Sequence, residues 1–346
     1  MSFRLRRMNT LDPRPVGRII RAEAVARLGF ELEELDPETG YLYELRGRGK
    51  SRVMVIGLSP INDAGSARLA ADKFYTALVL DRAGFKVPRC TRCLAPETFE
   101  LSSFPQYTGL ESARRFAGEH GFPLVVKPNR GSRGRDVTRV DNLSELEAAV
   151  ETVWQRDYLA LVQERVKGFD LRLDFLDGEY LLGYSRQPVV LTGDGKTSLG
   201  ELLAAWDTRF VGEAFEASLE TDPMWQNRVI AQGLTLTSVL PPEEQVALSE
   251  DILNLNRLCV ATMVRQLPDA WLRHCVAIGR ALQLRYFGID FKVPDLDPKL
   301  AGDPAAATVI EVNATPGLGQ TYRRGETEVA IRAQMRLLET ILAGAL

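Results

Sequence analysis

Histidine and cysteine are both scarce in this chain of 346 residues, which contains two His and four Cys. Four cysteines are too few for a disulfide framework in a chain of this length. No G-x-S-x-G segment accompanies His120 or His274, so the sequence offers no Ser–His nucleophile of the α/β-hydrolase kind. The pair Cys90 and Cys93 has no second tight Cys pair to complete a zinc site. We therefore expect chemistry that needs no protein nucleophile.

Long apolar runs and an excess of charge of one sign are also missing. No run approaches the ~18 residues that a membrane span needs, and the start MSFRLRRMNTLDPRP lacks the apolar core of a secretory signal. The 43 Lys and Arg are balanced by 46 Asp and Glu, which gives a net charge of −3. There is no overall basic field to hold a nucleic acid or an anionic membrane. We expect a cytoplasmic protein that binds neither, and the sequence leaves self-association into a homodimer open.

The order of helix and strand patterns predicts an α+β protein. Hydrophobic residues make up 45% of the chain and charged residues 26%, which are globular values. Residues 1–90 alternate between helix and strand patterns and predict a short α/β lobe. From residue 122 the pattern is strand, loop, strand, helix and strand, followed by a hairpin with its turn at 177–179. Further helices are expected over 198–220, 243–284 and 326–346, and a strand pair over 284–293 and 307–314.

The first candidate site is the segment PLVVKPNRGSRGRDV at residues 123–137. A predicted strand delivers Lys127 to a loop that contains Gly131, Ser132 and Gly134. Five cations lie close together in this part of an otherwise acidic chain: Lys127, Arg130, Arg133, Arg135 and Arg139. Glycines let the backbone approach an anion closely, and Lys and Arg neutralise phosphate charge. The segment indicates a phosphate-binding loop, with a solvated basic hairpin as the alternative.

The second candidate site combines GIDFKV with VIEVNATPG. Glu311 and Asn313 are two residues apart on a predicted strand, so both side chains project from one face. Asp290 lies on the preceding strand and can face the same side. Two carboxylates and an amide oxygen suit Mg²⁺, which binds a few protein oxygens together with water and substrate phosphates. The alternative is a set of surface acids at a strand edge.

The third candidate site is LALVQERVKGFDLRL at residues 159–173. An apolar strand runs into Gln163 and Glu164, where backbone amide and carbonyl groups could pair with a purine edge. Asp170, after the turn at Gly168, could accept hydrogen bonds from ribose hydroxyls, although an ordinary strand and turn would read the same way. The three segments together fit one ligand, ATP with magnesium.

These segments, in this order and spacing, resemble the ATP-grasp superfamily, and within it the ligase domains of cyanophycin synthetase and of bifunctional glutathione synthetase. The similarity covers roughly residues 55–320 and includes ARLAADKFYTALVLDRAGFKVP and SRQPVVLTGDGKTSLGELL as well as the three sites. The resemblance implies an ATP-grasp fold of two α+β subdomains that grip ATP. The short lobe at 1–90 would precede an ATP-grasp domain at 91–346, divided into a nucleotide-binding subdomain at about 91–165 and a C-terminal subdomain at about 166–346.

The resemblance also implies a role for each matching residue. Residues expected to bind the nucleotide are Lys73, Lys127, Ser132, Arg133, Gly134, Gln163, Glu164, Val166 and Asp170. Residues expected to bind two Mg²⁺ ions, with Mn²⁺ as a substitute, are Asp290, Glu311 and Asn313. Arg172 and Arg186 match positions near the carboxyl substrate or its phosphate, and Asn256 and Arg257 are the further catalytic candidates. The segment NLNRLCVATMV departs from the family, because the related ligases carry glycines there.

The activity that the resemblance implies is ATP-dependent ligation of a carboxylate to an amine. A substrate carboxylate would take the γ-phosphate to form an acyl phosphate and ADP, and an amine would then displace phosphate to form an amide or peptide bond. Amino acids or peptides are the expected substrates. Two alternatives remain open: a phosphotransferase on the same fold, and a nucleotide-binding module without turnover.

Overall fold

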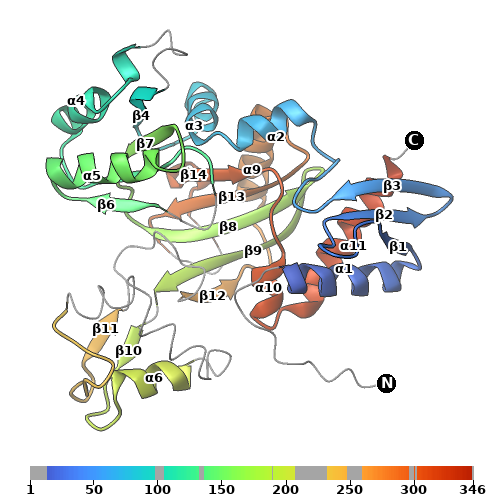
Figure 1. Cartoon of the computed structure of the whole chain (residues 1–346). Coiled ribbons are helices and arrows are strands. Elements are labelled where there is room, and N and C mark those ends of the chain that lie inside the picture. The colour runs from blue at the N-terminus through green and yellow to red at the C-terminus, as the bar shows by residue number, and fades with distance from the viewer. Residues whose placement is uncertain are drawn as a thin grey trace. The chain divides into compact units, whose positions relative to one another are not determined.

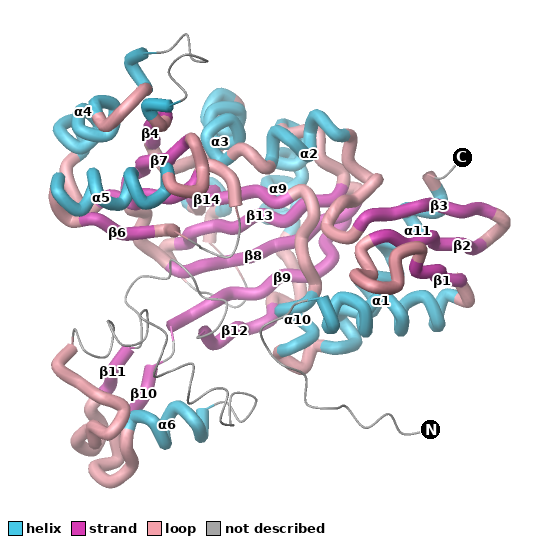
Figure 2. Tube along the Cα trace, in the orientation of Figure 1, coloured by secondary structure: helices cyan, strands magenta, loops and turns pink. Residues whose placement is uncertain are grey.

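The computed structural model describes residues 14–97, 105–131, 136–188, 190–206, 232–247, 259–295, 300 and 302–344. Its contacts divide the chain into two compact units. The first consists of Met1–Ser185 with Ala261–Leu346, and the second of Arg186–Val260. Helices and strands are mixed throughout, so the α+β prediction is confirmed (Figures 1 and 2). None of the described helices is both long and apolar enough to cross a membrane.

The two ends of the first unit pack together around a small antiparallel sheet of order β1-β2-β3. Its elements are α1 (Arg14–Leu28), β1 (Glu31–Glu34), β2 (Leu42–Gly47), β3 (Lys50–Val55) and α11 (Thr327–Ala343). Ile20, Leu45 and Leu338 are almost fully buried in their common core. The helix α1 ends before Gly29, whose φ of 64° favours glycine. The predicted helices near both ends of the chain are thereby confirmed.

A four-stranded antiparallel sheet of order β4-β7-β5-β6 has two helices packed on one of its faces. Its elements are β4 (Cys90–Leu94), α4 (Glu111–His120), β5 (Leu124–Pro128), β6 (Thr138–Val140), α5 (Leu143–Trp154) and β7 (Leu159–Glu164), with the short helix η2 (Pro105–Tyr107) before α4. Leu124, Val126 and Val162 pack under α4 and α5. Because side chains alternate along a strand, Lys127 and Gln163 face the other way. One face of this sheet is therefore left for a site.

The helix α5 begins with a capping box formed by Asn142 and Glu145. Asn142 Oδ1 accepts a hydrogen bond from the Glu145 backbone N–H at 3.0 Å. The Glu145 carboxylate in turn accepts from the Asp141 N–H at 2.9 Å. These contacts satisfy backbone donors that a helix N-terminus leaves without a helical partner.

A five-stranded sheet of order β12-β9-β8-β13-β14 forms the centre of the first unit (Figure 1). Its elements, with the neighbouring helices, are α2 (Ala64–Ala70), α3 (Lys73–Arg82), β8 (Phe169–Leu176), β9 (Glu179–Pro188), β12 (Cys259–Met263), α9 (Asp269–Ala281), β13 (Tyr286–Val293), η4 (Pro304–Ala306), β14 (Thr308–Asn313) and α10 (Gly319–Arg323). Leu173, Phe175 and Phe287 join one hydrophobic core with Trp271 of α9 and Leu80 of α3. The Phe175 and Phe287 rings stack at 5.4 Å. This core covers one face of β8 and β13.

The predicted hairpin turn between β8 and β9 is confirmed. Asp177 and Gly178 both have positive φ, 52° and 82°. Two consecutive residues with positive φ are what a two-residue type I′ turn requires, and this turn matches the twist of the strands that it joins.

The described part of the second unit is a small two-stranded sheet with a helix. It contains β10 (Val190–Thr192), α6 (Leu199–Trp206) and β11 (Gln245–Ala247). Leu191, Leu199 and Val246 are buried in its own core cluster. The helix predicted over 198–220 is confirmed as far as residue 206, and the remainder lies outside the described residues.

One of the expected elements differs from the structure. The prediction of a helix over 243–284 is wrong at β11 and β12, whereas α9 from Asp269 is helical, and residues 248–258 lie outside the described residues. Strand pairing overrides the helical pattern, because β11 pairs with β10 and β12 lies beside β9. The helix α2 begins after Asp63, whose side chain caps it by accepting from the Ser66 N–H at 2.9 Å.

Candidate nucleotide and metal site

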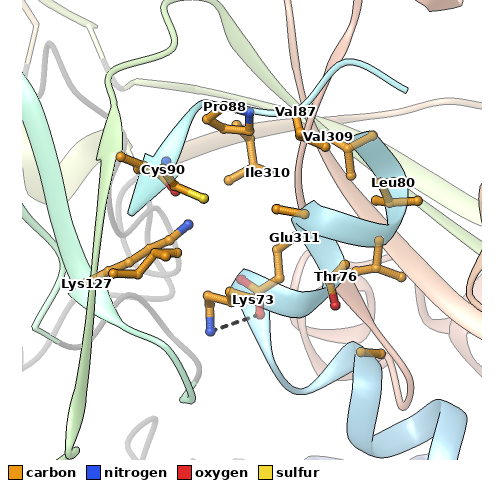
Figure 3. A pocket seen from close by; sticks show the side chains of 15 residues that line it. Lys73, Thr76, Leu80, Val87, Pro88, Cys90, Lys127, Val309, Ile310 and Glu311 are labelled. Carbon is orange, nitrogen blue, oxygen red and sulfur yellow. Dashed lines mark ion pairs between the residues drawn. The ribbon is translucent and has the colours of Figure 1, made fainter. Parts of the chain in front are cut away.

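The strongest group of candidate residues meets at one pocket of the first unit, where the open face of the four-stranded sheet lies against α3 and β14 (Figure 3). Cys90, Lys127 and Gln163 line it from the sheet, and Lys73 and Glu311 line it from α3 and β14. The side chains fill it tightly, since the cavity volume of about 10 Å³ is room for about one water molecule. A nucleotide therefore fits only if these walls separate.

Two lysines and one carboxylate set the charge of this pocket. Lys73 Nζ lies 3.6 Å from Glu311 Oε1, and the same Nζ donates to the Gly131 carbonyl at 2.9 Å. Lys127 is only 5% exposed. Burial lowers the pKa of Lys127 to about 8, with Glu311 opposing and Lys73 assisting the shift. The pocket thus holds two cations against one anion, which favours an additional anionic ligand.

The phosphate-loop segment is attached to the N-terminus of α3. The Asn129 carbonyl accepts from the Lys73 N–H at 3.3 Å, and Asn129 Oδ1 accepts from the Phe74 N–H at 2.9 Å. Asn129 itself is buried. These bonds bring Lys73 next to the start of the loop. Three nucleotide candidates, Ser132, Arg133 and Gly134, lie outside the described residues.

The predicted metal residues share one face of the β13–β14 pair. Asp290 is directly opposite Glu311, and Asn313 is opposite Gly288. Asn313 Nδ2 donates to Asp290 Oδ2 at 3.2 Å. Among the described residues, no group of three His, Cys, Asp or Glu could hold a metal by itself. Two carboxylates and one amide instead match the oxygen set that Mg²⁺ uses together with phosphate oxygens, so the residues present fit the ion.

Arg172 on β8 faces the same side and binds two acids. Its Nε donates to Asp174 Oδ1 at 2.6 Å, and its Nη1 donates to Asp290 Oδ2. Burial alone would lower the pKa of Arg172, but the carboxylates of Asp174 and Asp290 more than offset this and raise it well above its usual value. Arg172 is therefore a fixed positive charge beside the metal residues.

The residues predicted to bind the purine and ribose have protein partners in the structure. The Glu164 carboxylate accepts from the Arg89 N–H at 3.0 Å and from its Nε at 2.9 Å. Asp170 accepts from Lys292 Nζ at 3.0 Å. Val166 lies half-buried in the segment between β7 and β8. The nucleotide roles of these three residues stay predictions.

The hinge between β7 and β8 requires glycine at position 168. A Cβ there would lie 2.4 Å from the Val293 carbonyl oxygen, and the φ of Gly168 is 128°. This close approach places the start of β8 against β13, which brings Asp170 beside Lys292.

The other catalytic candidates are not brought to this pocket by the described structure. Arg186 lies on β9 at the start of the second unit, and Asn256 and Arg257 lie outside the described residues. Sequence reasoning missed Asp174 and Lys292. Their signal was the alternation of LRLDFL and GIDFKV, which puts Asp174 on the face of Arg172 and Lys292 on the face of Asp290.

Residues 70–232 match the family model that is described as an ATP-grasp domain. The chain is also distantly homologous to two larger enzymes. It is 27% identical over 298 residues to the glutathione biosynthesis bifunctional protein GshAB of Enterococcus faecalis. The matched region covers 84% of this chain and 38% of that protein. It is 29% identical over 265 residues to cyanophycin synthetase of Crocosphaera subtropica. That match covers 73% of this chain and 28% of the relative.

A solved structure agrees on the fold. The crystal structure of a bifunctional glutathione synthetase from Pasteurella multocida superposes with a TM-score of 0.55 and 22% identity, covering 87% of this chain and 40% of that one. This chain thus spans two fifths or less of the length of these relatives. The ATP-grasp fold that the sequence predicted is confirmed, whereas the division at residues 90 and 165 stays a prediction.

Proposed function

We propose that this protein is an ATP-dependent carboxylate–amine ligase that forms an amide or peptide bond and releases ADP and phosphate. The observation that carries the proposal is the placement of Lys73 and Lys127 against Glu311 in one pocket, with Asp290 directly opposite Glu311 on the neighbouring strand. Cations for phosphate and oxygens for magnesium are thereby close enough to act on one polyphosphate.

Each group of residues would have a separate task. Lys127 and Lys73 would bind phosphate oxygens, because their charges exceed that of Glu311 in the pocket. Asp290, Glu311 and Asn313 would hold Mg²⁺, two ions by family likeness, and the bound metal would neutralise charge on the transferring phosphoryl group. Gln163, Val166 and the strand end beside them would contact the purine. Arg172 would face the carboxyl substrate or its phosphate.

The substrates that we propose are an amino acid or short peptide supplying the carboxylate and a second one supplying the amine. The two relatives act in glutathione biosynthesis and cyanophycin synthesis, and the family resemblance implies amino acid or peptide substrates. A buried, water-poor pocket with fixed charges also suits an acyl phosphate, which water would otherwise hydrolyse.

The test is a screen for phosphate release over pairs of amino acids and dipeptides with Mg-ATP, with mass spectrometry of each product. We expect release that depends on both a carboxylate and an amine, and a product mass equal to their sum minus water. The control variant is Arg336→Ala, because Arg336 lies in an exposed ion pair with Glu179. A phosphorylated product made without any amine would identify a phosphotransferase instead, and nucleotide binding without turnover for any pair would contradict the ligase proposal.

A further inference from the structure

Charged side chains on the neighbouring strands β8 and β13 form ion pairs on one face of the central sheet. Asp170, Arg172 and Asp174 are spaced two apart on β8, so they share a face. Arg172 lies directly opposite Asp290 on β13, and Asp174 lies directly opposite Gly288. The guanidinium thus sits between the metal residue Asp290 and a second acid, Asp174, that belongs to no predicted binding set.

Both members of the Arg172–Asp174 pair are deeply buried. Arg172 is 9% exposed and Asp174 is 2% exposed. A buried carboxylate is costly unless it is paired and hydrogen-bonded, and Asp174 meets this condition through Arg172 Nε at 2.6 Å. Replacing such a pair by apolar residues is often neutral or stabilising. A contribution to stability therefore does not by itself explain why this buried ion pair is present.

The neighbouring strand makes room for the pair. A Cβ at Gly288 would lie 2.2 Å from Asp174 Oδ1 and 2.4 Å from Arg172 Nη2. Gly288 does not have a positive φ. A glycine is therefore needed here for the space that it leaves, and not for its backbone conformation. Two strands are thus shaped around one arrangement of the guanidinium.

We propose that Asp174 is a positioning residue that holds Arg172 through Nε, so that Nη1 orients the Asp290 carboxylate for Mg²⁺ without neutralising it fully. The inference rests on the proposed function, because it takes Asp290 as a metal ligand. The physical reason is a division of charge. While Asp174 binds Nε, part of the guanidinium charge is compensated there; without Asp174, Asp290 would be the nearest counterion and would bind Arg172 more strongly. A carboxylate held more tightly by a cation is a weaker metal ligand.

The decisive change is Asp174→Asn, which keeps the shape and removes the charge. The readout is Mn²⁺ binding in the presence of ADP, followed by electron paramagnetic resonance, so no turnover is needed. We expect the dissociation constant of Mn²⁺ to rise ~10-fold, the lower end of the range for losing a direct partner of a metal ligand, because Asp174 acts one step further out through Arg172. In an Arg172→Met background, Asp174→Asn should add little, because Asp174 acts through Arg172.

A second pair of variants covers the case in which Asp174→Asn does not fold. Gly288→Ala leaves every charge in place but presses a methyl group onto the Arg172–Asp174 pair, and it should weaken Mn²⁺ binding in the same direction. Gly302→Ala is the matched control, because a Cβ there meets nothing within 4 Å.

The outcomes separate this inference from the proposed function. Wild-type protein that binds no Mn²⁺ with ADP would overturn both. Unchanged Mn²⁺ affinity in Asp174→Asn and Gly288→Ala would overturn the positioning role while leaving the metal site intact. An equal loss with and without Arg172 would also overturn it, because Asp174 would then act by another route. Weaker binding that disappears in the Arg172→Met background supports the inference, whichever substrates the enzyme uses.

Discussion

The two faces of the β8–β13 strand pair have opposite chemistry although they share one backbone. One face carries Leu171, Leu173, Phe175, Phe287, Ile289 and Phe291, all nearly fully buried in one core. The other carries Asp170, Arg172, Asp174, Asp290 and Lys292, joined by ion pairs. Because successive side chains alternate, the core fixes where the charged residues stand. We therefore expect substitutions on the first face to cost stability and substitutions on the second to cost ligand binding and turnover.

The largest effect should come from Glu311→Gln, next to the charged face. The change keeps the side-chain shape, but removes a proposed metal ligand and the counterion of Lys73. We expect ATP turnover with saturating Mg²⁺ to fall about 10³-fold or more. The unfolding free energy without metal should fall only modestly, because Lys73 keeps its hydrogen bond to the Gly131 carbonyl. Near-normal turnover would contradict the placement of the metal site.

On the opposite face, Phe287→Ala should lower the unfolding free energy by about 3–5 kcal/mol, because it removes a fully buried ring and leaves a cavity. Phe287 stacks on Phe175 and also contacts the α9 position Gly279, where a Cβ would meet its ring at 2.3 Å. Urea denaturation measures the loss. The folded fraction should still bind Mn²⁺ with ADP as the wild type does. If this variant instead lost metal affinity while remaining folded, the two faces would not be separable.

Lys127 is a buried cation that should lower the stability of the fold and also bind the nucleotide. Its pKa of about 8 is below the ordinary Lys value, so the charged form is disfavoured in the folded state. The cost is present in full below pH 8. Between pH 8 and the pKa of Lys127 in the unfolded chain, the unfolded state binds more protons than the folded state. The free energy of unfolding therefore rises with pH in this range, and the cost of burying Lys127 disappears.

Lys127→Met should therefore be more stable than wild type at pH 7, by up to ~3 kcal/mol, and this difference should shrink towards pH 10. The same variant should lose ATP turnover. Denaturation of both proteins at the two pH values checks the first statement, with Arg336→Ala as the control. A Lys127→Met protein that is less stable at pH 7 would show that the lysine is retained for the fold.

The sequence predicted the strand geometry of Asp290, Glu311 and Asn313 better than it predicted the ion-pair partners of Glu164 and Asp170. Asp290, Glu311 and Asn313 lie on two strands whose period of two residues fixes their direction, and the register Asp290–Glu311 agrees. The partners of Glu164 and Asp170, in contrast, come from Arg89 and Lys292. No local sequence pattern predicts ion pairs between residues that lie far apart in the chain.

Pairing between distant strands also explains the element that was predicted wrongly. The sequence around Cys259–Met263 was expected to be helical, but it forms β12 at the edge of a sheet whose other strands come from other parts of the chain. The alternation along β8 could have placed Asp174 on the face of Arg172, but the space that Gly288 leaves for the pair could not be predicted, because such a glycine looks the same in the sequence as any other.

The smallest expected effect concerns Cys90, which faces the pocket beside Lys127. Burial raises the pKa of this thiol to about 11, although Lys127 acts to lower it. Since only the thiolate reacts, alkylation by iodoacetamide at pH 7.5 should be about 100-fold or more slower than that of an exposed thiol, and should rise about tenfold for each pH unit up to 11.

Labelling of Cys90 also tests whether a nucleotide uses this pocket. Trypsin cleavage after Arg89 and Arg92 isolates Cys90 from Cys93, so mass spectrometry can follow each thiol separately. Cys93 lies on the helix-covered side of the same sheet and serves as the internal control. If ATP binds beside Lys127, Mg-ATP should slow the labelling of Cys90 and leave Cys93 unchanged, because the two residues lie on opposite faces of one sheet. Equal rates at Cys90 with and without Mg-ATP would place the nucleotide elsewhere.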